Sequence, residues 1–202
     1  SAAFEVIVGT ILSGMFNDEK IDPVVIAQSG QFAENVYFGK PCGLMDQMAC
    51  SVGGMIHIDF KNPEEPVVEK VPSDFEAYQY SLCIVDTKAS HADLTDDYAQ
   101  IPADMKKVAK FFKENFLREV PEEEFYNQIS AMRGLLGDRP VLRAIHFMEE
   151  ETRVQKEVDS LKAGDFKEFL ELVKESGNSS FKYLQNVYTT NDLNQQAVSV
   201  AL

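Results

Sequence analysis

Positive charge is scarce in this sequence: 19 Lys and Arg residues stand against 33 Asp and Glu residues, and the formal net charge is −14. A surface this negative repels polyphosphate backbones, so we expect neither nucleic acid nor an anionic membrane as a partner. If the ligand is a nucleotide, backbone amides, a few cations or a metal must overcome this field. Cysteine is scarce as well, and an odd count of three without metal-type spacing favours a reducing cytoplasm.

Long apolar runs and the common nucleotide-loop motif are also missing. No stretch of about 18 uninterrupted apolar residues occurs, so we expect no membrane span. No signal peptide is visible. The absence of a G-x-x-x-x-G-K-[ST] loop excludes a Walker-type nucleotide site.

The first part of the chain mixes helix and strand patterns. Residues 2–16 are apolar on nearly every side, which predicts a buried helix. Asp22-Pro23 predicts the start of a second helix, because Asp caps free amides and Pro suits the first helical position. Residues 43–52 predict a short helix that ends at Gly53-Gly54. Three segments predict strands, the last of them buried inside a sheet: 55–60, 67–71 and 78–85.

Beyond residue 88 the pattern changes to helices. Helix starts are predicted near Pro102, Pro121, Asp138 and Asp165, with a break over 176–180 and another helix from about Phe181. The change near residue 88 predicts two domains, 1–88 and 89–202.

Asp46 is the first candidate for chemistry, in the segment Cys42-Gly43-Leu44-Met45-Asp46. It falls in the first turn of a short helix, where the macrodipole favours a carboxylate. A fixed carboxylate beside free backbone amides can position or deprotonate a hydroxyl. The alternative is that Asp46 only stabilises its own helix.

Glu34 and the start of the chain are the next candidates. Glu34 lies on an otherwise apolar helix face, where a carboxylate must be paired, hydrated or bound to a metal. Small residues such as Ser1 and Ala2 at a helix start let backbone amides approach a phosphate, and a serine hydroxyl can reach Mg²⁺. Close packing is the alternative there. His91 and Tyr98 follow a predicted strand, and loops at strand ends commonly carry ligand contacts. The alternative is that these side chains only form local hydrogen bonds or pack.

Four segments occur in order along the chain: SAAFE (1–5), QFAENVYFGKPCGLMDQMACSVGG (31–54), KASHADLTDDYA (88–99) and RPVLRAIHFMEEETRVQKEVDSLKAGDFKEF (139–169). Together they resemble galactokinase, in the GHMP kinase superfamily, and PCGLMDQ is typical of galactokinase-like sugar kinases. The resemblance implies an α+β fold. Its first part is related to ribosomal protein S5 domain 2, and its second part is helix-rich and ferredoxin-like.

The resemblance also implies a sugar site. Asp46 aligns with the catalytic aspartate that faces the sugar C1 hydroxyl, and Gly43 and Tyr98 align with sugar-contacting positions. The implied reaction converts ATP and α-D-galactose to ADP and galactose 1-phosphate. Phosphoryl transfer needs mainly positioning and charge stabilisation, which suits such a site.

For the nucleotide, the resemblance implies ATP and Mg²⁺ as cofactors. Ser1 aligns with the last serine of the phosphate loop, beside Ala2, and Glu34 aligns with the acid associated with Mg²⁺. The family's first motif, the phosphate-loop glycines and the third motif have no counterpart in the sequence. Ala99-Gln100-Ile101-Pro102 stands where arginine-rich sequence usually follows the tyrosine.

Both ends of the sequence run into apolar segments, whereas natural termini are usually polar. We therefore expect an internal piece of a galactokinase that is inactive by itself and self-associates through bare sheet edges and apolar faces. Two alternatives stay open. One is a kinase for a related sugar, such as L-arabinose or N-acetylgalactosamine. The other is a non-catalytic galactose-binding sensor, against which the retained Asp46 and Glu34 argue.

Overall fold

The computed structural model describes residues 2–39, 42–88, 95–194 and 196–202. The chain divides into two compact units, Ser1–Ser73 and Asp74–Leu202. The domain boundary predicted at residue 88 stays a prediction. None of the helices in the described part of the chain has both the length and the apolar character needed to cross a membrane.

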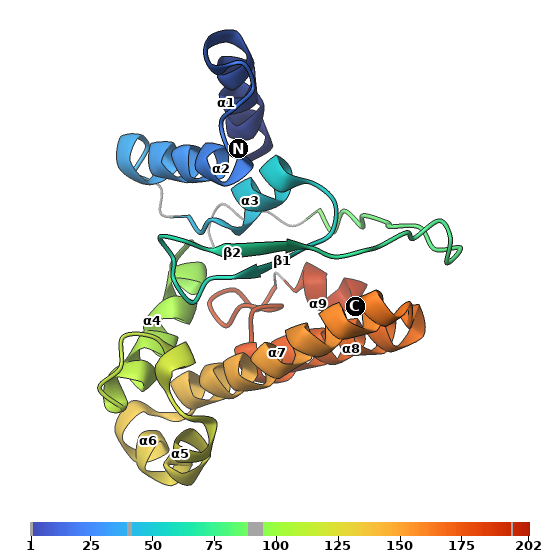
Figure 1. The fold of residues 1–202 in the computed structure, drawn as a ribbon. Coiled ribbons are helices and arrows are strands. Elements are labelled where there is room, and N and C mark those ends of the chain that lie inside the picture. The colour runs from blue at the N-terminus through green and yellow to red at the C-terminus, as the bar shows by residue number, and fades with distance from the viewer. Residues whose placement is uncertain (1, 40–41, 89–94, 195) are drawn as a thin grey trace. The chain divides into compact units, whose positions relative to one another are not determined.

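The first unit combines helices with a small antiparallel hairpin (Figure 1). Its elements are α1 (Ala2–Asn17), α2 (Pro23–Phe32), the π-helical turn η1 (Ala33–Tyr37), α3 (Met45–Val52), β1 (Ile56–Asp59) and β2 (Val67–Lys70). Asp22 caps α2 as predicted, because its carboxylate accepts the Val24 amide at 2.8 Å. In the hairpin, Ile56 lies opposite Lys70. The helices and the strands predicted at 55–60 and 67–71 are confirmed.

The predicted buried state of α1 is wrong, although the helix forms. Val6 and Ser13 are its buried residues, whereas Phe4, Met15 and Phe16 are each more than two-thirds exposed. The core of the unit instead gathers around Ala27 of α2 and residues of α3. A helix that is apolar all round can bury only the side that α2 and α3 reach, so the other sides face outward.

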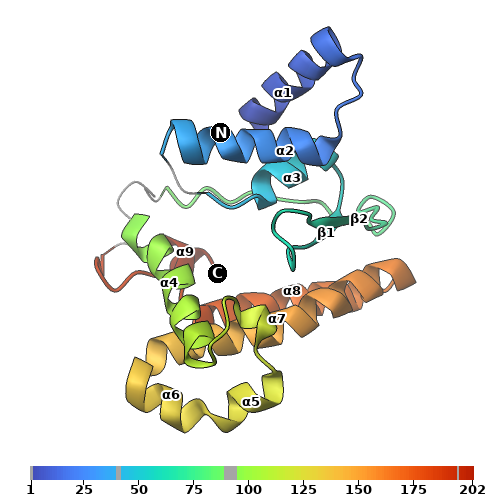
Figure 2. The ribbon, with the colours of Figure 1, turned by 60° about the vertical axis from the view of Figure 1, so that its left-hand side comes forward.

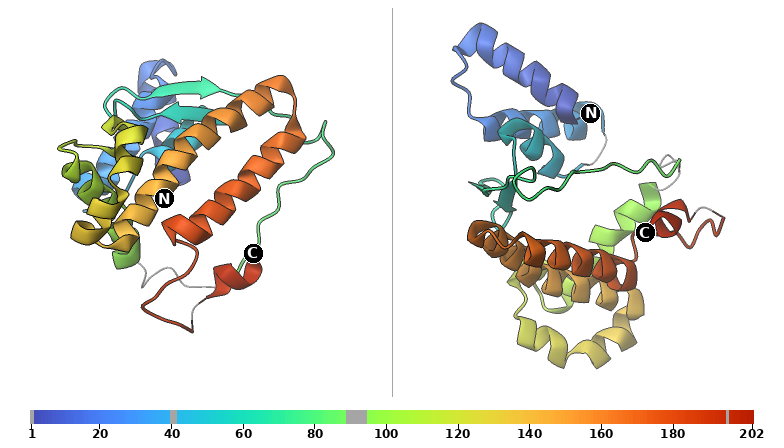
Figure 3. Two further views of the ribbon diagram at one scale, coloured as in Figure 1. Left: turned by 90° about the horizontal axis from the view of Figure 1, so that it is seen from below. Right: turned by 90° about the vertical axis from the view of Figure 1, so that its right-hand side faces the viewer.

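All regular secondary structure among the described residues of the second unit is helical. Its elements are α4 (Thr95–Phe111), the 3-10 turn η2 (Leu117–Glu119), α5 (Glu122–Asn127), α6 (Ile129–Leu136), α7 (Asp138–Ala163), α8 (Phe166–Ser179), the π-helical turn η3 (Ser180–Leu184) and α9 (Ala197–Ala201). Helices α7 and α8 lie antiparallel and side by side (Figure 3), and α4 packs on α7. The apolar core is built around Val108, Phe125, Met132 and Val141.

The helix boundaries of this unit follow the sequence in part. Gly164 ends α7 with a φ of 74°, a backbone conformation that glycine adopts freely. Asp165 then caps α8 by accepting the Glu168 amide at 3.0 Å. The predicted start at Pro102 is wrong, because Pro102 lies inside α4, which is held along α7. The predicted break over 176–180 is also wrong, because α8 continues directly into η3.

The strand predicted at 78–85 does not form. This segment is irregular, and the side chains of Leu82 and Ile84 are 88% and 94% exposed. The ring of Tyr78, the first residue of the segment, stacks on Phe166 of α8, with centroids 4.5 Å apart. A strand requires a neighbour for its backbone amides and carbonyls, and within the described residues the one sheet consists of β1 and β2.

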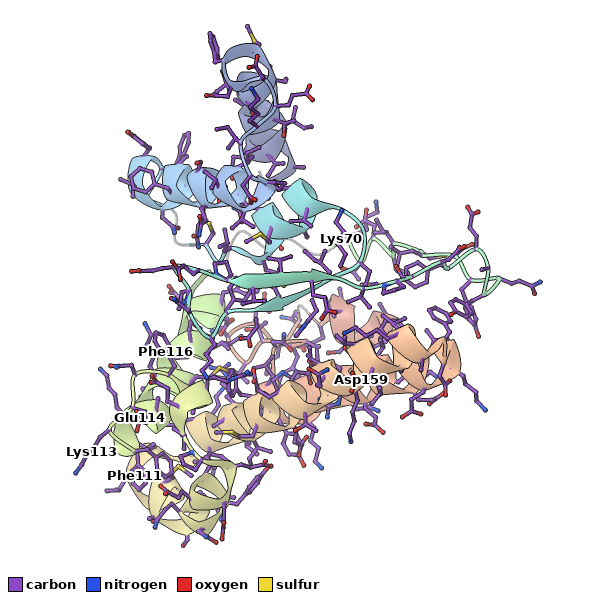
Figure 4. The ribbon with its side chains drawn as sticks, viewed as in Figure 1. Lys70, Phe111, Lys113, Glu114, Phe116 and Asp159 are labelled. Carbon is purple, nitrogen blue, oxygen red and sulfur yellow. The ribbon has the colours of Figure 1, made fainter. Side chains whose placement is uncertain are left out.

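A tight turn closes the end of α4. Figure 4 shows Phe111, Lys113, Glu114 and Phe116 around it. Lys113 has a φ of 66°, and the Phe116 amide donates to the Glu119 carboxylate at 3.0 Å. This acceptor satisfies an amide that the turn would otherwise leave unpaired.

Candidate functional site

Asp46 lies in the first turn of α3, as predicted. Its side chain is exposed and forms no hydrogen bond or ion pair with any described residue. Leu44 and Met48 of the same region are buried in the core of the first unit. The helix is therefore anchored through its buried side, and the Asp46 carboxylate is presented on the other.

Glu34 lies in η1 and is only 6% exposed. The Cys42 thiol lies close enough to its carboxylate for Glu34 to raise the pKa of the thiol. The sequence predicted that a carboxylate on this apolar face is paired, hydrated or bound to a metal, and the Cys42 thiol is one polar neighbour of it.

Gln47 connects this pair to α1. It is 2% exposed, and its side-chain nitrogen Nε2 lies 3.3 Å from Oε2 of Glu5 and 3.7 Å from Sγ of Cys42. Helices α1, α2 and α3 meet around these contacts (Figures 1 and 2). The residue that follows Asp46 is therefore tied both to the first turn of α1 and, through Cys42, to Glu34.

The backbone of Cys42 is clamped as well. Its amide donates to Oδ1 of Asn35 at 2.8 Å, and its carbonyl accepts from the side chains of Asn35 and Gln31. Gly43 follows directly and is exposed. These bonds hold the segment that leads into the Asp46 turn against α2 and η1.

The electrostatics of this cluster are dominated by carboxylates. Burial raises the pKa of the Cys42 thiol, and the hydrogen bond and negative charge of Glu34 and the more distant charge of Glu5 raise it further. The hydrogen bond from Gln47 acts in the opposite direction. Cys42 is thus a protonated hydrogen-bonding group at neutral pH rather than a reactive thiolate.

The remaining predicted residues are distributed over the chain. Ala2 is the first residue of α1, while Ser1 and His91 lie outside the described residues. Tyr98 belongs to the second unit, where it is exposed on α4. Its neighbour Asp97 accepts hydrogen bonds from the side chains of Thr189 and Asn191 at 2.8 and 2.9 Å. The first turn of α4 is therefore fastened to the segment around Thr189.

Sequence reasoning missed the network partners Glu5, Cys42 and Gln47. Glu5 carried a signal that was available, because it is a lone carboxylate in a helix that is otherwise apolar. Gln47 carried none, since nothing in the pattern of α3 shows that an amide is buried there. In the described part of the chain no group of three or more His, Cys, Asp or Glu residues is arranged to hold a metal ion.

Known proteins similar to this chain are kinases. Residues 1–54 match a family model described as GHMP kinases N terminal domain. The galactokinase of Thermotoga maritima is 32% identical over 181 residues, which cover 89% of this chain and 48% of that protein. The galactokinase of Streptomyces coelicolor is 31% identical over 170 residues, which cover 82% and 42%.

A solved structure is similar over the same extent. The crystal structure of Lactococcus lactis galactokinase complexed with galactose matches with a TM-score of 0.67 and 26% identity, over 91% of this chain and 47% of that one. The chain thus spans less than half the length of these relatives. The matches confirm the predicted resemblance and the partial α+β fold.

Proposed function

This chain belongs to the GHMP kinase superfamily, and we propose that it supplies part of the active site of a galactokinase. The reaction transfers the γ-phosphoryl group of ATP to the C1 hydroxyl of galactose. The C1 oxygen bonds to the γ-phosphorus, the bond from that phosphorus to the bridging oxygen of ADP breaks, and the hydroxyl proton passes to Asp46. The observation that carries the proposal is an exposed Asp46 carboxylate on a turn that the partly buried contacts of Gln47 and Cys42 connect to Glu34.

Asp46 is the proposed catalytic residue. A carboxylate that has no partner among the described residues, on an anchored helix, can accept a hydrogen bond from a sugar hydroxyl and hold it in line for attack. Gly43, which is exposed just before the helix, and Tyr98 on α4 are the proposed sugar contacts. The similarity to the Lactococcus lactis galactokinase, whose crystal structure is a complex with galactose, supports this choice of sugar.

The phosphate end of the site is assigned to the start of α1. Ser1 and Ala2 are proposed to meet the phosphates, where the helix N-terminus favours negative charge. Mg²⁺ commonly takes one or two protein carboxylates together with substrate phosphates. The buried Glu34 carboxylate suits that donor set, and Ser1 is the proposed second ligand. A bound Mg²⁺ would neutralise charge on the phosphates.

The setting proposed for this activity is a reducing cytoplasm. Cys42, Cys50 and Cys83 are all free thiols, which supports it. Galactose and ATP are the proposed partners. Self-association stays a prediction, supported by the apolar side chains that α1 exposes.

The test is replacement of Asp46 by Asn in the intact natural protein, with galactose-dependent ADP release as the readout. Loss of the proton acceptor should lower kcat about 10²- to 10⁴-fold while galactose binding, measured by calorimetry, persists. Asp18→Asn is the matched control, because Asp18 is an exposed aspartate of the same unit that pairs with Lys20.

Three outcomes separate the candidate functions. A natural protein that neither turns over nor binds galactose would remove the assignment. Turnover of L-arabinose or N-acetylgalactosamine in preference to galactose would keep the kinase and change the sugar. Galactose binding without turnover, unaffected by Asp46→Asn, would indicate a sensor.

A further inference from the structure

Gln47 occupies a position that packing alone does not explain. It lies between the exposed Asp46 and the fully buried Met48, and its own side chain is 2% exposed. Its Oε1 atom is buried without a hydrogen-bond partner among the described residues. An unpaired buried oxygen lowers stability, and an apolar side chain of the same size would avoid that cost. The hydrogen bonds that this amide does make are both on its nitrogen.

That nitrogen helps to fix the rotation of α3, together with the buried Leu44 and Met48. Successive residues of an α-helix point about 100° apart, so fixing Gln47 in the interior turns Asp46 toward solvent. The bond from Nε2 to Glu5 fixes the helix against the first turn of α1, and the contact with Cys42 fixes it against the Glu34 pair. Gln47 thus contacts both the helix that carries the proposed catalytic Asp46 and the start of α1, which is proposed to meet the phosphates.

The backbone of α2 leaves room for this anchor at Gly30. A Cβ atom at that position would lie 3.2 Å from Oε2 of Glu5 and 3.5 Å from Cγ of Gln47. The distance to Glu5 is tighter than most real Cβ contacts, whereas the distance to Gln47 is ordinary van der Waals contact. The glycine allows Glu5 and Gln47 to meet against the helix.

We propose that the Glu5–Gln47 hydrogen bond positions the Asp46 carboxylate for phosphoryl transfer, with Gln47 as a positioning residue rather than a catalytic one. The inference rests on the proposed function. Its geometric part, the coupling of Glu5, Gln47 and Cys42, concerns the chain itself and can be measured without activity.

The geometric part is tested through the Cys42 thiol, in the 202-residue chain with Cys50 and Cys83 changed to Ser. The rate of alkylation by iodoacetamide is followed against pH, because it reports the fraction of thiolate. Gln47→Met removes a donor to the sulfur and should move the profile to higher pH. Glu5→Gln removes a negative charge and should move it to lower pH, with Glu34 the other carboxylate facing the thiol. Profiles that do not move would overturn the network.

Gln28→Met is the matched control, since Gln28 is a half-buried glutamine of the same unit that donates to the Glu64 carbonyl. It should leave the alkylation profile unchanged. A shift as large as that of Gln47→Met would mean that the profile reports general loosening of the unit, and this too would overturn the network.

The positioning part is tested by exchanging donor and acceptor in the intact natural protein. Gln47→Glu places a second carboxylate against that of Glu5. It should lower kcat about 10- to 100-fold, because a small misplacement of a reacting group has an effect of this size. The KM for ATP should change much less. The double variant Glu5→Gln with Gln47→Glu restores a hydrogen bond in the reverse direction and should regain most of the lost kcat. Gln28→Glu, the same change at the control position, should leave kcat unaltered.

The outcomes are distinguishable. A kcat that the double variant does not restore, or a loss of activity that only follows the loss of folded protein, overturns the positioning role. A natural protein without kinase activity overturns the proposed function and the positioning role together, while the alkylation profile still reports separately whether the network exists.

Discussion

Each unit buries a polar side chain at a helix contact, and the two differ in how well that side chain is paired. In the second unit, Arg143 is 1% exposed and donates to Asp104 at 2.8 Å and to the Leu184 carbonyl at 3.2 Å. Asp104 also accepts from Gln100 and Lys107. In the first unit, the buried Gln47 leaves its oxygen unpaired.

The charges of the second unit behave as a structural pair. Burial by itself would raise the pKa of the Asp104 carboxyl, but the hydrogen bonds of Lys107 and Gln100 and the charges of Lys107 and Arg143 bring it below its ordinary value. Burial and the charge of Arg139 lower the pKa of Arg143, yet a guanidinium stays protonated in proteins, so the pair remains ionic. It joins α4, α7 and η3.

The difference indicates two reasons why a polar side chain is buried in this protein. A fully paired group costs little free energy and fixes which helices meet, so it belongs to the fold. A group left partly unpaired breaks the rule of complete pairing, and such exceptions concentrate at functional sites. On this comparison, the Arg143 cluster holds the second unit together, whereas Gln47 is proposed to serve the candidate site at Asp46. Buried nitrogens of Arg139 and Arg153 in the second unit also lack a hydrogen-bond partner among the described residues.

The largest effect is expected from breaking the paired cluster. Arg143→Met leaves the Asp104 carboxylate buried with one ionic partner fewer, and should lower the free energy of unfolding by about 3–5 kcal/mol. Urea titration followed by far-UV circular dichroism measures it, because the chain has no tryptophan. Arg143→Met combined with Asp104→Leu should recover most of the loss. A decrease below about 1 kcal/mol for the single variant would contradict the structural role.

Gln47→Met is the matched variant in the first unit. It removes the unpaired oxygen together with the donor, so the free energy of unfolding should change by less than about 1 kcal/mol. A loss as large as that of Arg143→Met would show that both polar groups serve the fold, and the comparison would fail.

The sequence predicted local structure better than it predicted burial. Asp22, Gly164 and Asp165 mark helix boundaries through their own backbone and side-chain chemistry, so they were readable in isolation. The exposure of α1 and the missing strand at 78–85 depend on which surfaces lie nearby, and no local pattern contains that information.

In the candidate site, too, local features were predicted and features that depend on tertiary contacts were not. Asp46 and Glu34 became candidates through local patterns, a carboxylate in a first helical turn and a carboxylate on an apolar helix face, and the resemblance implied their roles. Gln47 was not, because its importance lies in contacts with Glu5 and Cys42, which are 42 and 5 residues away in the sequence. Residues that act through tertiary contacts become visible only when the helices are assembled.

A smaller effect is expected from pH, through His146 of α7. This side chain is 8% exposed, and its Nδ1 lies 2.9 Å from Oγ of Ser179. Burial lowers its pKa in the folded state, with Arg153 acting in the same direction and Glu149 and Glu150 in the other. The unfolded chain therefore binds a proton more readily, and stability is lost as the pH falls through the unfolded value of about 6.5.

The loss should not exceed about 1.4 kcal/mol per pH unit, because one proton is involved. His146→Gln keeps a hydrogen-bonding partner for Ser179 and removes the titration. The difference in free energy of unfolding between the two proteins, measured from about pH 7.5 to about pH 5, should shift in favour of the variant as the pH falls. A constant difference across this range would mean that His146 does not titrate differently in the two states.

The smallest effect is expected at an ion pair with the same chemistry as Arg143–Asp104 but without its burial. Nε of Arg133 lies 2.6 Å from Oδ1 of Asp138, and these side chains are 60% and 66% exposed. Water screens the two charges in the folded protein and solvates them equally well when the chain unfolds, so the pair adds little. Arg133→Met should leave the urea midpoint unchanged at low and at high salt. A loss approaching that of Arg143→Met would show that the geometry of an Arg–Asp pair, rather than its burial, sets its contribution in this protein.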